Sequence, residues 1–200
     1  MAAMGQAEPW LTGTKPNLLI NDRNLVLIGC RACGKTSVGK ALARALARPF
    51  VDLDEVLVAK TGRSIAEIVN EQGWLEFRKR EKALVQLYGR LSGQVLAPGG
   101  GVVLDRENVE ILRAHGLVIW LTADPATLGR RLRADQGTRE FRPSLTGQDP
   151  VAEIEQVLAE RAPLYRAAAH LIMDTTGLSI DQEVQRILQE IEKINRHKKS

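Results

Sequence analysis

The sequence has few of the features that mark specialised classes of protein. Aromatic residues make up 4% of its 200 residues, and its formal charge of +4 is small for a chain of this length. No apolar run reaches the roughly 20 residues that a membrane-spanning helix needs. The first residues lack a basic stretch followed by an apolar one, which argues against a secretory signal. We therefore expect a globular cytoplasmic domain without a membrane segment.

Cysteine and histidine are too few and too scattered for a structural zinc site. Cys30 and Cys33 form a single C-x-x-C pair, and His115, His170 and His197 lie far apart in the chain. A zinc site normally needs four closely spaced ligands of these types. One hypothesis stays open, namely that a Cys30–Cys33 disulfide would distort the surrounding loop and block its ligand.

Part of the positive charge lies in the C-terminal tail, residues 193–200. No aromatic residues alternate with its basic side chains, as they do in segments that bind single-stranded nucleic acid. We interpret the tail as a solvated helix end and expect no nucleic-acid partner. The length suits one domain, and we expect a monomer.

The most informative stretch is a glycine-rich loop with the pattern G-x-x-x-x-G-K-[ST]. It follows the apolar run 25–28 and precedes a helical segment, 37–48, and this strand-loop-helix context is typical of a phosphate-binding loop. Its backbone N–H groups and the helix N-terminus favour anions. Lys35 can reach the β- and γ-phosphates of a nucleotide, and the Thr36 hydroxyl can bind Mg²⁺. The predicted nucleotide-binding residues here are Gly29, Cys30, Arg31, Ala32, Cys33, Gly34, Lys35, Thr36 and Ser37.

Two acids follow the loop at a spacing of two. We expect Phe50 to Asp54 to form a short strand, so that Asp52 and Asp54 point to the same side. At the carboxyl end of a parallel strand they would face the ligand crevice, hold metal-bound water and accept a proton. The alternative is that Asp54 caps the next helix; we favour the functional interpretation.

The region from 55 to 92 is predicted to be helical and to cover an acceptor substrate. Ser64 and Glu67 have the spacing of a capping box, and we expect one helix up to Gly73 and a longer one from Trp74 towards Leu91. Arg78 and Arg80 point about 200° apart on a helix, so only one of them can face a given pocket.

The next strand, 94–97, ends at Pro98 and three glycines, Gly99 to Gly101. These glycines allow close approach of the backbone to a ligand, although a flexible loop is the alternative. A continuous apolar strand, 117–122, should be buried on both faces, and Asp124-Pro125 begins a helix.

The polar stretch 134–147 follows that helix and carries Arg139 and Arg142, which suits a mobile lid over phosphates; a plain surface loop is the competing interpretation. Beyond it we expect a helix from Val151 to Arg161 with Pro163 outside it, a strand at 170–174 and a helix at 179–192. The alternation of strands and helices predicts a parallel sheet with helices on both faces.

Seven motifs occur in one order along the chain, and together they resemble the shikimate kinase family over residues 24–191. The ordered motifs are the phosphate loop, Asp52-Leu53-Asp54, Thr61-Gly62-Arg63-Ser64-Ile65, Glu76-Phe77-Arg78, Gly99-Gly100-Gly101, Arg142-Pro143-Ser144-Leu145 and Arg161-Ala162-Pro163-Leu164-Tyr165. The resemblance implies an α/β P-loop kinase fold of three layers, with a five-stranded parallel sheet of order 2-3-1-4-5. It also implies Mg²⁺-dependent transfer of phosphate from ATP to the 3-hydroxyl of shikimate, a step towards chorismate and aromatic amino acids.

On this resemblance the chain consists of an N-terminal extension (1–23), one kinase domain (24–192) and the C-terminal tail. The domain would carry a substrate-binding insertion at about 55–92 and a lid at about 134–147. The implied catalytic residues are Lys35, Asp54 and Arg142, and Arg142 also contacts ATP. Thr36 would bind Mg²⁺ directly and Asp52 through water, and Arg131 would stack on adenine. The implied shikimate-binding residues are Asp54, Arg78, Gly99, Gly100, Gly101 and Arg161.

Some alternatives remain open from the residues alone. Arg130 competes with Arg131 for adenine, and Arg139 competes with Arg142 in the lid. The acceptor could be gluconate or a nucleoside monophosphate in place of shikimate. A nucleotide-binding regulatory module without turnover is a further alternative, against which the intact loop and both acids argue.

Overall fold

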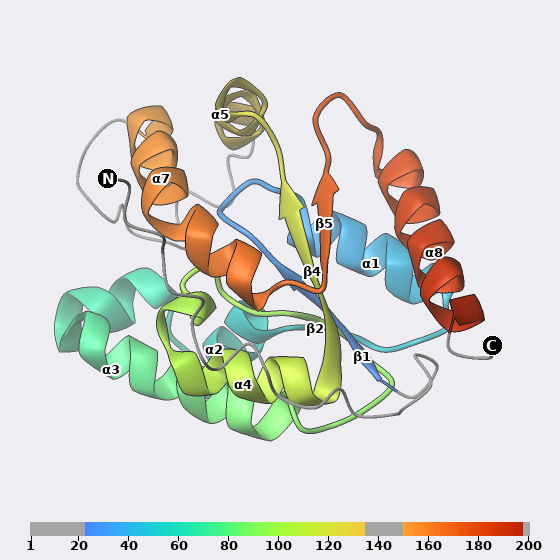
Figure 1. The fold of residues 1–200 in the computed structure, drawn as a ribbon. Helices are drawn as coiled ribbons and strands as arrows, with labels where there is room; N and C mark the ends of the chain where they lie inside the picture. The colour runs from blue at the N-terminus through green and yellow to red at the C-terminus, as the bar shows by residue number, and fades with distance from the viewer. Residues whose placement is uncertain (1–22, 135–149, 198–200) are drawn as a thin grey trace, which may run out of the picture.

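The structure is a computed structural model that describes residues 23–134 and 150–197 (Figure 1). Five parallel strands form one sheet in the order β2-β3-β1-β4-β5, which confirms the predicted strand order. The strands are β1 (Asn24–Ile28), β2 (Phe50–Asp52), β3 (Val95–Ala97), β4 (Gly116–Thr122) and β5 (Leu171–Asp174).

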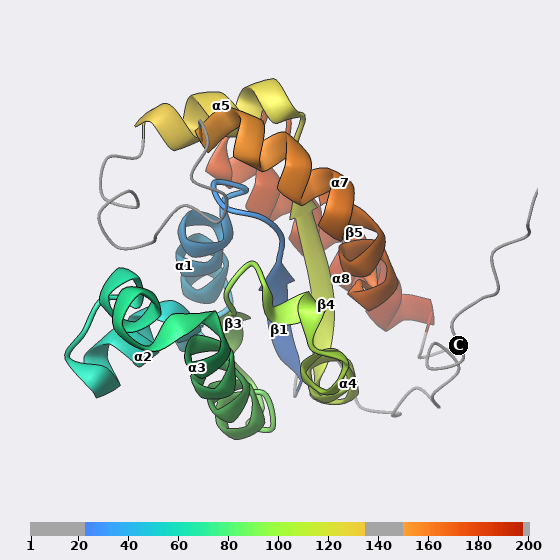
Figure 2. The same ribbon diagram turned by 90° about the vertical axis from the view of Figure 1, so that its left-hand side faces the viewer.

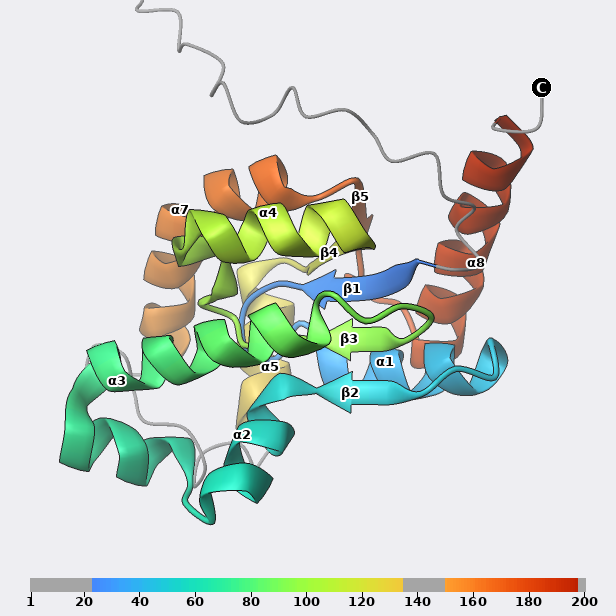
Figure 3. The same cartoon turned by 90° about the horizontal axis from the view of Figure 1, so that it is seen from below.

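Helices cover both faces of the sheet. They are α1 (Lys35–Ala45), α2 (Leu53–Thr61), α3 (Ile65–Tyr88), α4 (Arg106–His115), α5 (Pro125–Ala134), α7 (Pro150–Ala168) and α8 (Ile180–His197). Helices α1 and α8 pack together on one side, and α4 and α7 lie on the other (Figure 1). Helix α3 packs against α2 and α4 (Figure 3). The three-layer α-β-α arrangement predicted for the chain is therefore present.

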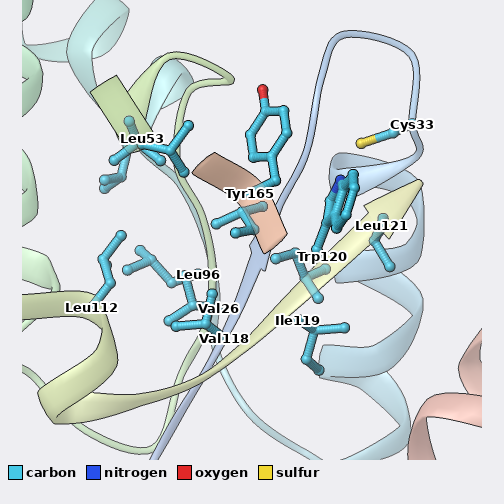
Figure 4. Packing of buried hydrophobic residues seen from close by; sticks show 14 of the residues in the cluster. Val26, Cys33, Leu53, Leu96, Leu112, Val118, Ile119, Trp120, Leu121 and Tyr165 are labelled. Atoms are coloured by element: carbon cyan, nitrogen blue, oxygen red, sulfur yellow. The ribbon is translucent and has the colours of Figure 1, made fainter. Parts of the chain in front are cut away.

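The centre of the core lies along β1 and β4. All five residues of β1 are buried, as are the first six of β4, so the continuous apolar run is covered on both faces as expected. Val26 pairs in register with Val118, and Leu96 of β3 lies beside them (Figure 4). Trp120 stacks on Tyr165 of α7, with ring centroids 5.7 Å apart. This packing anchors the strand ends from which the loops emerge.

The prediction that the second strand reaches Asp54 is wrong. The strand ends at Asp52, and α2 begins at Leu53. The Asp52 carboxylate accepts hydrogen bonds from the backbone N–H groups of Asp54 and Glu55, at 3.0 and 3.4 Å. These bonds make Asp52, and not Asp54, the N-cap of α2. Asp54 lies in the first helical turn, where a negative charge suits the helix dipole.

The prediction that Pro163 lies outside a helix is also wrong, because α7 continues through it to Ala168. A proline inside a helix removes one N–H donor and strains the preceding turn. Here the residues after it are firmly packed, since Tyr165 is fully buried and Ala168 is 2% exposed. Tertiary packing thus outweighs the local preference of proline.

Other helix ends differ from the predictions by a few residues. Helix α1 ends at Ala45, before Ala47 adopts a positive φ of 52°. The two helices predicted for the 64–91 region are confirmed, because Gly73 has a non-helical backbone, with φ 80° and ψ 166°, and divides α3 at the expected place. Helix α8 extends to His197, so most of the expected C-terminal tail continues this helix.

Two predicted segments lie outside the described residues, except for one end position each. They are the lid beyond residue 134, with Arg139 and Arg142, and the N-terminal extension before residue 23. In the described part of the chain, no helix is both long and apolar enough to cross a membrane.

Candidate active site

The loops that carry the predicted site residues all leave the carboxyl edge of the sheet. Ile28, the last residue of β1, pairs with Trp120, and Asp52 at the end of β2 pairs with Ala97 at the end of β3. Because the strands are parallel, the phosphate loop, the start of α2 and the glycine run emerge side by side. Helix α2 and the first part of α3 extend from this edge (Figure 2).

The phosphate loop depends on two glycines with positive φ. Gly29 has φ 144° and Gly34 has φ 101°, a region that other residues rarely adopt. A Cβ atom on Gly29 would also overlap the Leu121 carbonyl and lie 2.7 Å from Cys33 Sγ. Helix α1 begins directly after Gly34, so its unpaired N–H groups lie beside the loop. This is the geometry that binds phosphate.

Lys35 is held inside the loop by backbone acceptors. Its ammonium group donates to the carbonyl oxygens of Gly29 and Cys30, both at 2.9 Å, and its side chain is 8% exposed. The loop opens onto a cavity of about 520 Å³, a volume in the range of small-molecule sites. The cavity is lined by Arg31, Ala32, Gly34, Lys35, Thr36, Ser37, Val38, Asp52, Pro98, Arg131, Ala134, Leu178, Ser179, Ile180 and Glu183. We call it the nucleotide cavity.

Two oxygen ligands suited to Mg²⁺ lie beside this cavity. The Thr36 hydroxyl donates to the Asp52 carboxylate at 2.9 Å, so the two predicted metal residues are in contact. Among the described residues, no group of three or more His, Cys, Asp or Glu side chains could hold a metal ion. One hydroxyl and one carboxylate fit an ion that keeps several waters and takes further ligands from phosphate oxygens, as Mg²⁺ does.

The two loop cysteines are free thiols, and both are buried. A hydrogen bond from Cys30 lowers the pKa of Cys33, and the ammonium of Lys35, 3.8 Å from Cys33 Sγ, lowers it further. The same hydrogen bond and burial raise the pKa of Cys30. The disulfide hypothesis stays a prediction, and equal ATP affinity under oxidising and reducing conditions would contradict it.

A second cavity of about 310 Å³ receives arginines from two helices. Arg78 of α3 and Arg161 of α7 both line it, although they are far apart in the sequence. Arg80 pairs instead with Glu76 and the Gln72 side chain, as expected if only one arginine of that pair faces the pocket. The lining residues are Trp74, Arg78, Leu104, Gln156, Val157, Glu160 and Arg161. We call it the acceptor cavity.

Arg78 is oriented by an acid that the sequence did not reveal as functional. Its guanidinium pairs with Glu81 at 2.5 Å and lies over the ring of Phe77, 5.0 Å from the centroid. Glu81 is 3% exposed; burial raises its pKa, and Arg78 acts in the opposite direction. A Cβ atom on Gly99 would lie 2.5 Å from Glu81 and 3.1 Å from Asp54. The sequence feature that could have identified Glu81 as the partner of Arg78 is their i, i+3 spacing on a helix.

The glycine run connects the two helices of the acceptor cavity. The Gly100 carbonyl accepts hydrogen bonds from the Tyr165 hydroxyl at 2.5 Å and from Arg161 at 3.5 Å. A Cβ atom on Gly101 would overlap the Arg78 guanidinium, so only glycine allows this approach. Burial raises the pKa of Tyr165, which remains a neutral donor. Its contact with Gly100 was not predicted from the sequence.

Of the adjacent arginines on α5, Arg131 faces the nucleotide cavity. It donates to the Thr175 hydroxyl at 3.0 Å and to the Thr175 carbonyl at 3.1 Å, and it pairs with Glu183 at 3.2 Å. Arg130 is exposed and donates to the Thr127 hydroxyl at 3.1 Å. The geometry therefore favours Arg131 for a contact with the nucleotide.

A family model for shikimate kinase matches residues 31–192. The chain belongs to the shikimate kinase family. A shikimate kinase from Syntrophus aciditrophicus is 43% identical over 176 residues, which cover 84% of this chain and 90% of that protein. A protein named shikimate kinase 2 from Sodalis glossinidius is 43% identical over 169 residues, and the matched region covers 84% of this chain and 95% of that protein.

A solved structure has the same fold. Shikimate kinase from Acinetobacter baumannii, determined in complex with shikimate, superposes with a TM-score of 0.81 at 32% identity. The match covers 88% of this chain and 96% of that protein. Similarity to shikimate kinases therefore extends over both cavities of the described structure.

Proposed function

We propose that this chain transfers the γ-phosphoryl group of ATP to the 3-hydroxyl of shikimate, giving 3-phosphoshikimate and ADP. This reaction is a step towards chorismate and aromatic amino acids. One observation carries the proposal: in a member of the shikimate kinase family, Arg78 and Arg161 converge on a cavity at the carboxyl edge of the sheet that also carries the phosphate loop.

On the donor side, the loop backbone and Lys35 would hold the phosphates of ATP. The ammonium of Lys35 lies within the loop, among the loop carbonyls, where it would stabilise charge on the transferred group. Mg²⁺ would neutralise part of the phosphate charge when bound, with Thr36 as a direct ligand and Asp52 acting through water.

On the acceptor side, a small carboxylate fits the two arginines. Guanidinium groups bind carboxylates through paired, charge-assisted hydrogen bonds, and Arg78 and Arg161 would hold opposite sides of the shikimate carboxylate. Gly99, Gly100 and Gly101 would form the adjoining wall, where the absence of side chains lets the ring lie against the backbone.

Asp54 is the candidate group for the reacting hydroxyl. It is 8% exposed, and its carboxylate lies 3.1 Å from the place where a Cβ atom on Gly99 would be. A carboxylate in this position can accept a hydrogen bond from the hydroxyl and take its proton during transfer. Most of the catalysis would come from positioning and charge stabilisation. Arg142 of the predicted lid would add positive charge near the transferred phosphate.

We further propose a cytoplasmic monomer without a nucleic-acid partner. The residues proposed for both substrates all belong to this chain. The two free thiols suit a reducing compartment.

The test is release of ADP from Mg·ATP with shikimate, gluconate or AMP supplied in turn. We expect ADP release that depends on shikimate and is at background with the other two acceptors. Release that depends on gluconate or AMP instead would assign a different acceptor. If none of the three acceptors raises ADP release above background, the result would favour a regulatory module.

A further inference from the structure

One buried acid in the nucleotide cavity has no part in the proposed reaction. Glu183 of α8 is 2% exposed and lines the cavity. It differs from Glu190 and Glu192 of the same helix, whose side chains are 35% and 66% exposed and pair with neighbouring Lys193 and Arg196. A glutamate is rarely buried unless it is paired or has a defined role.

The contacts of Glu183 join three parts of the nucleotide cavity. Its Oε1 atom accepts from Arg131 of α5 at 3.2 Å. The other two hydrogen bonds of Arg131 go to the Thr175 hydroxyl and carbonyl. Its Oε2 atom lies 3.7 Å from the place where a Cβ atom on Gly34 would be. Glu183 and Thr175 thus hold the guanidinium from two directions, beside the phosphate loop.

We propose that Glu183 is a positioning residue for the nucleotide: it holds the Arg131 guanidinium across the nucleotide cavity and thereby sets the KM for ATP. The inference rests on the proposed function, in which Arg131 contacts the adenine base. Arg131 has a long, flexible side chain, and fixing it before binding reduces the entropy lost when ATP binds.

Stability alone does not explain an acid at this position. Glu183 Oε2 is buried and has no hydrogen-bond partner among the described residues. Burying a charged pair with an unsatisfied oxygen generally stabilises less than an apolar side chain of the same volume. Burial raises the pKa of Glu183 to about 7, while Arg131 acts to lower it. The acid therefore makes the fold less stable, which is consistent with a role in binding.

The first experiment compares Glu183→Met and Glu183→Gln with the wild type in steady-state kinetics. Methionine keeps the volume and removes the acceptor, and we expect it to raise the KM for ATP roughly 5- to 10-fold. Glutamine keeps an acceptor without the charge, and we expect a rise of roughly 2- to 3-fold. The kcat and the KM for shikimate should stay within about twofold of the wild type. Glu192→Gln, on the same helix, is the matched control and should change nothing.

The melting temperature separates positioning from a structural role. We expect Glu183→Met to melt at or above the wild-type temperature while its KM for ATP is raised. An unchanged KM for ATP in this variant would overturn the proposal. A lowered melting temperature with equal rises in the KM of both substrates would also overturn it, because the residue would then only support the fold.

The Kd of Mg·ATP, measured by calorimetry without an acceptor, tests the role of Glu183 independently of the proposed reaction. A weakened ATP Kd in Glu183→Met supports the role of Glu183 even if shikimate is not the acceptor. If Glu183→Met binds Mg·ATP with the wild-type Kd, the positioning role is overturned, whatever happens to the turnover of shikimate.

A pH series supplies a third readout. The charged or titratable groups around Glu183 are Arg131 from α5, Cys33 and Lys35 from the phosphate loop, and Arg31 at the cavity wall. We expect the ATP KM ratio between Glu183→Gln and wild type to be largest at pH 8, where Glu183 is ionised, and to approach one at pH 6. Titration of ATP itself cancels in this ratio. A ratio that is independent of pH would contradict a role for the charge.

Discussion

The nucleotide cavity and the acceptor cavity are built from different parts of the chain. The nucleotide cavity is centred on one contiguous segment, the phosphate loop, and α5 and α8 supply a further wall. The loop's cation, Lys35, is held by the backbone carbonyls of Gly29 and Cys30. The acceptor cavity combines α3 and α7, and its cation, Arg78, is held by the side chain of Glu81.

This difference predicts which substitutions each half will tolerate. In the loop, recognition comes mainly from backbone N–H groups, so unusual side chains such as those of Cys30 and Cys33 are accommodated. In the acceptor cavity, recognition depends on individual side chains whose positions come from separate helices. We therefore expect substitutions to separate cleanly into those that alter ATP binding and those that alter shikimate binding.

The largest effect is expected for Asp54→Asn, in the first turn of α2 beside Gly99. The amide keeps the volume but cannot accept the proton, and we expect kcat to fall by roughly 10²- to 10⁴-fold. Binding of Mg·ATP, measured by calorimetry, should stay close to that of the wild type because Asp54 is outside the phosphate loop. A variant with nearly full turnover would remove Asp54 as the proton acceptor.

A smaller but more selective effect is expected for Arg161→Ala. Losing one side of the carboxylate clamp should raise the KM for shikimate roughly 10- to 100-fold, the range for a charge-assisted hydrogen bond. The KM for ATP should not change. Arg161→Lys should recover only part of the loss, because lysine cannot form the paired contact. An unchanged shikimate KM in Arg161→Ala would mean that the carboxylate binds elsewhere.

Tyr165→Phe tests whether the acceptor cavity also depends on its supporting residues. The change removes the hydrogen bond to the Gly100 carbonyl and leaves the ring stacked on Trp120. We expect a loss of about 1 kcal/mol in the free energy of unfolding and a rise of roughly twofold in the shikimate KM. Denaturant unfolding and kinetics measure the two effects. A larger change in the ATP KM than in the shikimate KM would contradict the separation of the two halves.

Glu183→Met is expected to change stability in a way that depends on pH. The pKa of Glu183 is raised from 4.5 to about 7 in the folded protein, so the folded state binds more protons than the unfolded state between these values. Wild-type stability should therefore fall as the pH rises through this window. The variant lacks this titration, so its stability relative to the wild type should be higher at pH 8 than at pH 4.5 by about 3 kcal/mol, the size that the pKa shift implies. A gain that does not change with pH would contradict the burial of an ionisable group here.

Features set by neighbouring residues could be predicted from the sequence. The phosphate loop, the capping box at Ser64 and the apolar strand at 117–122 all depend on local patterns, and the structure has them. The start of α2 was missed because the Asp52 carboxylate competes for backbone N–H groups that an extended strand would leave free. The passage of α7 through Pro163 depends on packing around Tyr165, which no local pattern reveals.

The site residues that were missed act through contacts between distant segments. Glu81 and Tyr165 were missed because each meets the glycine run. Glu183 was missed because α8, which packs against α1, places it beside Arg131 of α5 and Gly34 of the loop. The choice between Arg130 and Arg131 needed the structure for the same reason. Successive helical residues point about 100° apart, and only the packing of α5 decides which one faces the nucleotide.

The most direct test of the proposed reaction is the identity of its product. The product of Mg·ATP and shikimate can be examined by a phosphorus–proton correlation NMR experiment. We expect one phosphomonoester whose phosphorus couples to the proton on carbon 3 of shikimate. Coupling to another ring proton, or the absence of any phosphorylated shikimate, would contradict the proposed arrangement of the two cavities.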